Sequence, residues 1–156
     1  MIYGEASVTV AAAPAQVLEL ICDIERYKLA DTKIRKVLET KADGDQIVVR
    51  FRSRLRGLPT PAVRQRVART GDDRVDITSV PSWADRLVDF RGSVTCTPTA
   101  AGTHVVHREE FHPHGLLQPV FERFLGRWLA RDIDYEVARL GQLLDEPASA
   151  PPEASS

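Results

Sequence analysis

The chain has 156 residues, of which 43% are hydrophobic and 28% charged, which is typical of one soluble domain with its own core. Its formal net charge of -1 argues against nucleic acid or an anionic membrane surface as the main partner. The two cysteines, Cys22 and Cys96, are far apart and form no C-x-x-C motif, so neither a disulfide framework nor a cysteine-based zinc site is expected.

The N-terminal segment predicts one strand followed by two short helices. Residues 2–11 alternate between apolar and polar side chains in their second half, which is typical of a strand. Pro14 suits the first position of a helix that ends near residue 22. Asp23 is placed to cap a second helix over residues 24–29, because its carboxylate can accept the free backbone N–H groups there.

From residue 33 to residue 112 the hydrophobic pattern has a period of two, which is typical of strands with one buried face. Turn-forming residues, mostly Gly, Pro and Asp, divide this region into short segments. The predicted strands are residues 34–40, 46–55, 61–70, 74–80, 87–97 and 103–112. Their close succession indicates an antiparallel sheet that includes the first strand as a seventh member.

Residues 117–145 predict one long helix, about 43 Å in length at roughly 1.5 Å per residue. Its apolar residues recur every four positions, which gives the helix one inclined apolar stripe. The stripe consists of Leu117, Phe121, Leu125, Leu129, Ile133 and Val137. Phe124 and Trp128 widen it in the first half, so we expect the N-terminal half to be more deeply buried and to cover a ligand chamber. The C-terminal half is expected to anchor the helix to the sheet.

Residues 146–156 are rich in Pro, Ala and Ser, and they predict a disordered tail behind a single domain of residues 1–145. Met1 leads directly into the first strand, without the basic and apolar regions of a signal peptide. No apolar run approaches the roughly 18 residues that a membrane span needs. We therefore expect a cytoplasmic protein, and the abundance of Ala and Arg is compatible with a bacterial, GC-rich genome.

This order of elements resembles the helix-grip fold of the START and birch-pollen-allergen superfamily, also called SRPBCC. Three segments carry the resemblance: VTVAAAPAQVLELICDIERY, GTHVVHREEFHPHG and FLGRWLARDIDYEVARL. Together they resemble the bacterial polyketide cyclase/dehydrase branch. The resemblance implies an α+β fold in which a curved seven-stranded antiparallel sheet surrounds the long helix, with a cavity between them.

His107 and Glu109 stand two positions apart on the last predicted strand, so both side chains point to the same face as Val105 and Phe111. The resemblance places that face toward the cavity. A carboxylate can orient an imidazole and raise its pKa, so this pair is a candidate general acid/base pair. The alternative is purely structural pairing with neighbouring strands.

Arg64 and Arg66 lie on the predicted strand 61–70, and two registers are open for them. If they face inward, the resemblance places Arg66 where aromatase/cyclases carry a cavity arginine, which would stabilise an enolate or carboxylate oxygen. If Val63 and Val67 face inward, both arginines are solvated, and the period-two hydrophobicity favours this second register. Arg66 is therefore a third candidate catalytic residue under the first register only.

A row of four arginines is easier to place on the strand of residues 46–55. Arg50, Arg52, Arg54 and Arg56 alternate with Phe51 and Leu55, so the arginines are expected to face solvent. This basic ridge is either a solvated face or a docking surface for an acidic partner, such as a carrier protein that delivers substrate. Aromatic residues do not interleave with it, which argues against nucleic acid.

The four histidines invite a metal hypothesis, which their positions do not support. His104 and His107 point to opposite faces of the strand, while His112 and His114 flank a proline where the strand ends. The zinc-protease pattern H-E-x-x-H and the glycine-rich phosphate loops are both absent from the sequence. No metal and no cofactor are expected.

The remaining candidates would form the wall of the cavity. Trp83 lies in a loop at the expected mouth, Tyr27 offers a phenol from the second short helix, and the aromatic residues of the long helix would cover the chamber. Core packing is the alternative for each. The candidate ligand-binding residues are Tyr27, Phe51, Arg64, Trp83, Phe90, Val105, Phe111, Leu117, Phe121, Phe124 and Trp128.

The preferred hypothesis is an enzyme without a cofactor that binds a hydrophobic, polyketide-like molecule and promotes its cyclisation or dehydration. His107 with Glu109 would move a proton, and Arg66 would stabilise the negative oxygen that develops. The alternative is a carrier or sensor of a lipid or aromatic metabolite that uses the same cavity without catalysis. A third possibility is a protein-interaction domain that binds through the basic ridge.

Overall fold

The computed structural model describes residues 1–81, 88–115 and 118–145. The helices are α1 (Pro14–Cys22), α2 (Ile24–Tyr27) and α3 (Gln118–Asp145). The strands are β1 (Ile2–Val10), β2 (Ile34–Asp43), β3 (Gln46–Leu55), β4 (Leu58–Thr70), β5 (Arg74–Ser79), β6 (Val88–Thr99) and β7 (Gly102–Pro113). The expected tail falls outside the described residues.

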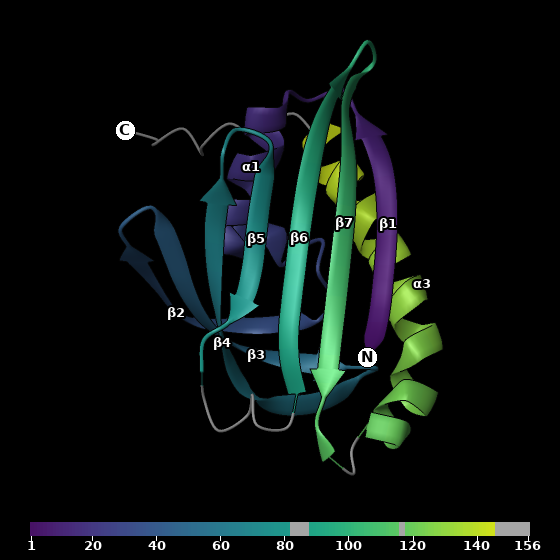
Figure 1. The fold of residues 1–156 in the computed structure, drawn as a ribbon. Coiled ribbons are helices and arrows are strands. Elements are labelled where there is room, and N and C mark those ends of the chain that lie inside the picture. The colour runs from purple at the N-terminus through teal and green to yellow at the C-terminus, as the bar shows by residue number, and fades with distance from the viewer. Residues whose placement is uncertain (82–87, 116–117, 146–156) are drawn as a thin grey trace, which may run out of the picture.

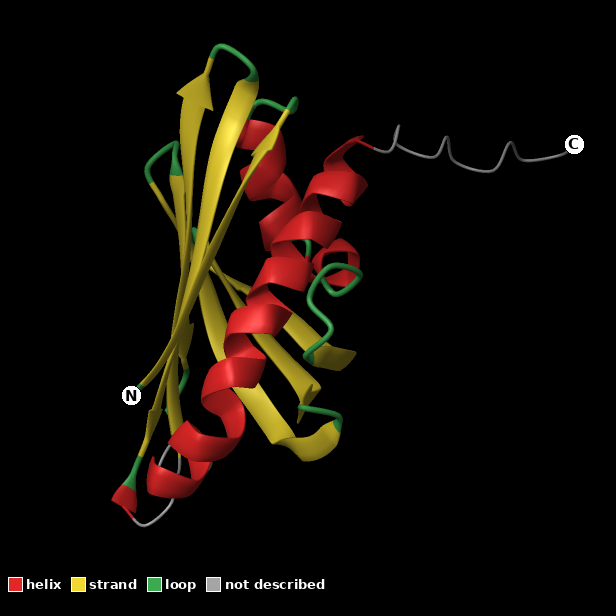
Figure 2. Cartoon of the chain, turned by 90° about the vertical axis from the view of Figure 1, so that its right-hand side faces the viewer, coloured by secondary structure: helices red, strands yellow, loops and turns green. Residues whose placement is uncertain are grey.

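The seven strands form one antiparallel sheet in the order β1-β7-β6-β5-β4-β3-β2. The first strand therefore pairs with the last one, and the other strands follow as a meander. All three helices lie on the same side of the sheet, and α3 crosses it diagonally (Figure 1 and Figure 2). The α+β arrangement predicted from the period-two pattern and the long apolar stripe is confirmed.

The turn between β3 and β4 is tighter than the sequence indicated. A loop was expected around Gly57, Leu58 and Pro59, but the strands continue until only Arg56 and Gly57 remain between them. Both residues have positive φ, 52° and 82°, as a two-residue hairpin of the primed type requires. Arginine is unusual at such a position. Its guanidinium contacts α3, where Nη1 donates a hydrogen bond to the carbonyl oxygen of Phe124 at 3.1 Å.

The apolar stripe of α3 faces the sheet as predicted, and it packs mainly along β1. Its buried apolar side chains are Leu125, Leu129, Ile133, Val137 and Leu140. Gly4 of β1 allows this close packing, because a Cβ atom there would lie 3.2 Å from Cγ of Leu129. A Cβ atom at Gly141 of α3 would lie 3.5 Å from Val8, which is an ordinary contact distance. No helix in the described part of the chain is both long and apolar enough to cross a membrane.

The expectation that the N-terminal half of α3 is the more deeply buried one is wrong. Residues 118–124 are exposed or half-buried, whereas the fully buried side chains begin at Leu125 and continue to Leu140. Phe124 is 47% exposed, because its ring lies under the guanidinium of Arg56 rather than against the sheet. The first turns of α3 lie beside a cavity rather than over a filled core, so their aromatic residues have less to pack against.

Substitution of Leu129 by alanine tests how strongly the packing of α3 against the sheet stabilises the fold. The side chain is fully buried between β1 and α3, so Leu129→Ala is expected to lower the free energy of unfolding by about 2–5 kcal/mol. Val120→Ala on the same helix is the control, because Val120 is exposed and its loss should change the stability by less than about 0.5 kcal/mol. Urea denaturation measures both, and equal effects would contradict the burial pattern.

Candidate functional site

A cavity of about 200 Å³ lies between the concave side of the sheet and the helices. Most of its wall is apolar. Aliphatic side chains come from α1, α2 and the strands β2 to β6, and four phenylalanine rings come from β3, β6, β7 and α3. The rings are those of Phe51, Phe90, Phe111 and Phe121, and Phe90 meets Phe111 edge to face with centroids 5.0 Å apart. Such a wall suits an apolar, aromatic guest.

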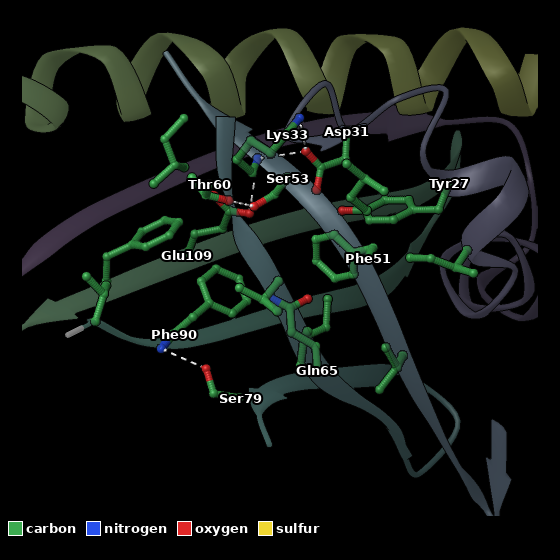
Figure 3. Close-up of a pocket in the computed structure, with 18 of the residues that line it drawn as sticks. Tyr27, Asp31, Lys33, Phe51, Ser53, Thr60, Gln65, Ser79, Phe90 and Glu109 are labelled. Carbon is green, nitrogen blue, oxygen red and sulfur yellow. Dashed lines mark hydrogen bonds and ion pairs between the residues drawn. The ribbon is translucent and has the colours of Figure 1, made fainter. Parts of the chain in front are cut away.

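The charged side chains of the cavity gather at its helix side (Figure 3). Tyr27, Asp31, Lys33 and Glu109 line it there, and each is almost completely buried. Tyr27 belongs to α2, Asp31 and Lys33 to the loop between α2 and β2, and Glu109 to the inward face of β7. We call these residues, together with His107, Asp132 and Glu136 behind them, the buried polar cluster.

Lys33 is the centre of the buried polar cluster. Its ammonium nitrogen lies within 3.2 Å of an oxygen of each of four carboxyl groups. The distances from Nζ are 2.5 Å to Glu136, 3.1 Å to Asp31, 3.1 Å to Asp132 and 3.2 Å to Glu109. The loop after α2, strand β7 and helix α3 are thereby joined through one side chain.

Glu136 is the main acceptor of the cluster. It sits on the buried face of α3, where its Oε1 accepts a hydrogen bond from the hydroxyl of Tyr27 and lies 3.2 Å from Nδ1 of His107. Its Oε2 accepts from Lys33. Both carboxylate oxygens are therefore occupied, and a charged group can be buried when its partners satisfy it in this way.

The charges of Lys33 and Glu136 stabilise each other. Burial disfavours the ionised form of Glu136, but the neighbouring Lys33 and His107 outweigh this effect and hold the pKa of Glu136 well below its ordinary value. Burial likewise opposes the charge of Lys33, yet Asp31, Glu109, Glu136 and Asp132 raise the pKa of Lys33 well above its ordinary value. Both groups stay ionised at neutral pH.

The pKa values of Asp31 and Glu109, the two carboxyl groups that line the cavity, shift upward, whereas that of Glu136 shifts downward. Burial, followed by the charge of Glu136, raises the pKa of Asp31 to about 7. Burial also raises the pKa of Glu109, against the opposing effect of Lys33. The carboxylate of Glu136 raises the pKa of His107 despite the burial of the ring. A carboxyl group whose pKa approaches neutrality can both donate and accept a proton, as general acid/base catalysis requires.

Two polar atoms of the cluster have no hydrogen-bond partner within the described residues. They are Nε2 of His107 and Oε2 of Glu109. The two side chains face each other, but the distance from Nε2 to Oε1 of Glu109 is 3.9 Å, which is too long for a hydrogen bond. Glu109 lines the cavity and His107 does not, so Glu109 is the one of these two side chains that a bound molecule can meet.

Among the residues that the structure describes, two sets of side chains have the composition of a metal site. His107, Glu109 and Glu136 form one, and Asp31, Asp132 and Glu136 form the other, with ligand atoms within 4.8 Å of one another in each set. The ammonium group of Lys33 lies among the carboxylates of both sets and supplies the positive charge that they share. A metal ion would have to displace Lys33, so the donor atoms fit an ammonium group better than a divalent cation.

The inward face of β7 carries the side chains expected there. Thr103, Val105, His107 and Glu109 are buried on one face, and Phe111 continues it into the cavity wall. His107 and Glu109 are therefore neighbours in the buried polar cluster, although only Glu109 lines the cavity. Val105 lies deeper and belongs to the hydrophobic core. The roles of His107 and Glu109 in catalysis stay predictions.

The inward placement of Arg64 and Arg66 is wrong. Val63, Gln65 and Val67 line the cavity, so the arginines between them fall on the opposite face of β4. Hydrophobic alternation had favoured this register, and the resemblance had favoured the other one. Arg66 thus lies across the sheet from the cavity and cannot stabilise an oxygen inside it. Arg50, Arg52 and Arg54 are exposed as expected.

The other predicted ligand residues divide between the cavity, the core and the surface. Tyr27, Phe51, Phe90, Phe111 and Phe121 line the cavity. Trp128 packs instead against the small core cluster of Ile2, Leu125 and Leu129, and Phe124 lies at the surface beside Arg56. Trp83 and Leu117 lie outside the described residues.

Sequence reasoning missed Lys33, Asp132 and Glu136, and it gave Asp31 no partner. One signal for Glu136 was present: it lies three positions after Ile133 and four before Leu140, inside the apolar stripe of α3. A carboxylate on a buried helix face needs a cation or several donors. That requirement could have prompted a search for a lysine on the elements that face the helix.

The curved sheet, the long helix and the mostly apolar cavity between them define a helix-grip protein with a START-like fold. The chain belongs to the family described as polyketide cyclase / dehydrase and lipid transport, which matches residues 1–145. Family and cavity together support a role in binding a hydrophobic small molecule. A search of the curated proteins found no match.

Solved structures with this fold include enzymes and proteins of other description. A protein from Thermus thermophilus matches with a TM-score of 0.76 at 14% identity, covering 91% of this chain and 96% of that one. The Zhui aromatase/cyclase from Streptomyces sp. R1128 has a TM-score of 0.72 at 20% identity, covering 90% and 92%. A START superfamily protein from Mycobacterium smegmatis has a TM-score of 0.67 at 15% identity, covering 92% and 97%. Identities this low carry the fold and not the activity.

Proposed function

We propose that the protein binds a hydrophobic, polyketide-like molecule in the cavity and promotes its cyclisation or dehydration, with Glu109 as the group that transfers the proton. One observation carries this proposal. The cavity wall is mostly apolar and its charged side chains gather at one end, where the buried carboxyl group of Glu109 has an oxygen without a partner among the described residues. The aromatase/cyclase among the structures of the same fold is consistent with it.

The chemistry needs little more than positioning and one proton acceptor. The ionised Glu109 removes a proton from the carbon between two carbonyl groups, which leaves an enolate on the substrate. The enolate carbon then attacks a second carbonyl group that the cavity wall holds nearby, and the resulting alkoxide takes the proton back from the carboxyl group of Glu109. In a dehydration, the ionised Glu109 removes a proton from the carbon next to the one that bears the hydroxyl and then donates it to that hydroxyl, so that a carbon–carbon double bond forms, the C–O bond breaks and water departs.

The rest of the buried polar cluster positions Glu109. Lys33 holds one oxygen of its carboxylate and leaves the other free, while the nearby ring of His107 favours the ionised form. Lys33 and His107 are in turn fixed by Glu136 on α3. Such support keeps a reacting group in its productive geometry. His107 is thus a positioning residue in this proposal, and Arg66 has no part in it.

The variant Glu109→Gln tests the proposal, because glutamine keeps the shape of the side chain and cannot take up the proton. We expect the rate of cyclised product formation from a linear poly-β-ketone to fall by about 10²–10⁴-fold. The affinity for the substrate should stay within a few-fold. The control is Glu110→Gln, since Glu110 is only half-buried on the other face of β7, near His112.

The second candidate function is a carrier or sensor of a hydrophobic metabolite. The fourfold pairing of Lys33 favours it, because the same contacts also serve to anchor α3 to the loop after α2. A carrier would bind the poly-β-ketone and release it unchanged, in the wild type as in Glu109→Gln. The absence of product with both proteins would therefore contradict the catalytic proposal and support this one, whereas equal and measurable rates would exclude Glu109 as the proton-transferring group.

A further inference from the structure

The hydrogen-bonding capacity that remains at the polar end of the cavity restricts the chemistry of the ligand. An ammonium group has three protons, and that of Lys33 is surrounded by four carboxyl oxygens. The hydroxyl proton of Tyr27 is used as well, because it is donated to Glu136. The donors of Lys33 and Tyr27, which line this end of the cavity, are thus committed to the protein itself.

The remaining capacity is that of an acceptor. Oε2 of Glu109 has no partner among the described residues, although the side chain is only 2% exposed. An unpaired carboxylate oxygen at such depth is costly, and a ligand that donates a hydrogen bond to it would remove the cost. The site is therefore incomplete without a donor from the ligand.

The charge of the cluster also favours a ligand that donates a hydrogen bond over one that carries a carboxylate. Asp31, Glu109, Asp132 and Glu136 supply four carboxyl groups, against which stand the ammonium of Lys33 and the imidazole of His107. A carboxylate brought to this end would lie beside these carboxyl groups and would find no uncommitted donor on Lys33 or Tyr27. It would lose its hydration without compensation.

The other polar groups of the cavity do not offer a second anion site. The hydroxyls of Ser53 and Thr60 are 2.5 Å apart and bond to each other, whereas Oγ of Ser79 accepts from the backbone N–H of Phe90 and keeps its own proton to donate. Gln65 on β4 lines the wall away from α3 (Figure 3). This amide and the hydroxyl of Ser79 are neutral donors that could meet a carbonyl group, but they do not offset the burial of a carboxylate.

We infer that the ligand is a compact aromatic or alicyclic molecule with a hydroxyl or amino head group that donates a hydrogen bond to Glu109, and that carboxylate-bearing molecules such as fatty acids are rejected. The inference rests on the proposed function in that both use the same cavity. An engineered cavity of about 150 Å³ holds one benzene ring, so about 200 Å³ suits one or two rings. A phenolic or enolic polyketide fragment meets these requirements.

Calorimetric titration with unreactive probes of one shape tests the inference. The probes are 2-naphthol, naphthalene and 2-naphthoate, which differ in the head group alone. We expect 2-naphthol to bind at least about tenfold more tightly than naphthalene, because a hydrogen bond to a charged group is worth that much, and 2-naphthoate to bind more weakly than either. The variant Glu109→Gln should reduce the advantage of 2-naphthol to about threefold or less, because the charged acceptor is gone. The variant Glu110→Gln should leave it unchanged.

Equal binding of 2-naphthol and 2-naphthoate would overturn the inference, and so would the failure of all three probes to bind. None of the probes reacts, so the outcome does not depend on turnover. If the protein selects 2-naphthol but leaves the poly-β-ketone unchanged, the ligand preference is supported and the proposed catalysis is contradicted. If the protein cyclises the poly-β-ketone but does not select 2-naphthol, the catalysis is supported and this inference is contradicted.

Discussion

Replacing Lys33 with methionine is expected to lower the free energy of unfolding by at least about 3–5 kcal/mol at neutral pH, which is the usual cost of removing one partner from a buried ion pair. Here four carboxyl groups would lose their common cation at once. Methionine fills a similar volume, so lost packing contributes little. Urea denaturation of the wild type and the variant measures the difference.

The loss of unfolding free energy in Lys33→Met is also expected to depend on pH. Without the ammonium group, burial and mutual repulsion raise the pKa values of the carboxyl groups above those of the unfolded chain. An acid whose pKa is raised on folding binds more protons when folded, so its contribution to stability falls as the pH rises through that range. The free energy of unfolding of the variant should therefore be close to that of the wild type at about pH 5, and the difference between them should be largest at about pH 8.

An exposed lysine provides the control for Lys33→Met. Lys41 forms an ion pair with Glu39 at 2.9 Å, but its side chain is 70% exposed. Water and salt screen such a pair, so Lys41→Met should leave the unfolding curve and its pH dependence nearly unchanged. A loss for Lys33→Met that is equally small, or that is the same at both pH values, would contradict the view that Lys33 neutralises the cluster.

The fold could be predicted because its information is local. Each strand shows its buried face by an alternation of two, and α3 shows its own by a repeat of four. The same alternation placed Arg64 and Arg66 correctly on the outer face of β4, where the family resemblance alone had led inward. Periodicity thus reports which side of an element is buried, provided that polar residues do not interrupt it.

The buried polar cluster could not be predicted because it depends on which loops and helices meet. Lys33 and Glu136 are 103 residues apart and belong to elements whose patterns do not refer to each other. Lys33 stands just before β2, where a lysine is ordinarily taken for an exposed residue. The prediction that the N-terminal half of α3 is more deeply buried failed for a related reason, since this part of the helix lies beside a cavity. A wide apolar arc on a helix does not show whether the arc contacts the protein core or a ligand.

Substitution of Glu136 tests whether the cluster acts as one unit. Glu136→Leu leaves Lys33, His107 and the hydroxyl of Tyr27 without their shared acceptor, so a loss of about 3–5 kcal/mol is expected for this variant as well. If the two residues stabilise the fold through each other, the double variant Lys33→Met with Glu136→Leu must lose less than the sum of the single losses. A coupling of about 1–3 kcal/mol is expected.

The exposed pair Lys41 and Glu39 supplies the matched double-mutant cycle, in which the effects should be additive. Additive losses for Lys33 and Glu136 would mean that each acts separately, and that α3 is held by its apolar stripe alone. Coupled losses would mean that the helix over the cavity is held in place by the same lysine that binds one oxygen of Glu109. The position of the helix and the orientation of the proton-transferring group would then be set together, because neither could change without breaking a contact of Lys33.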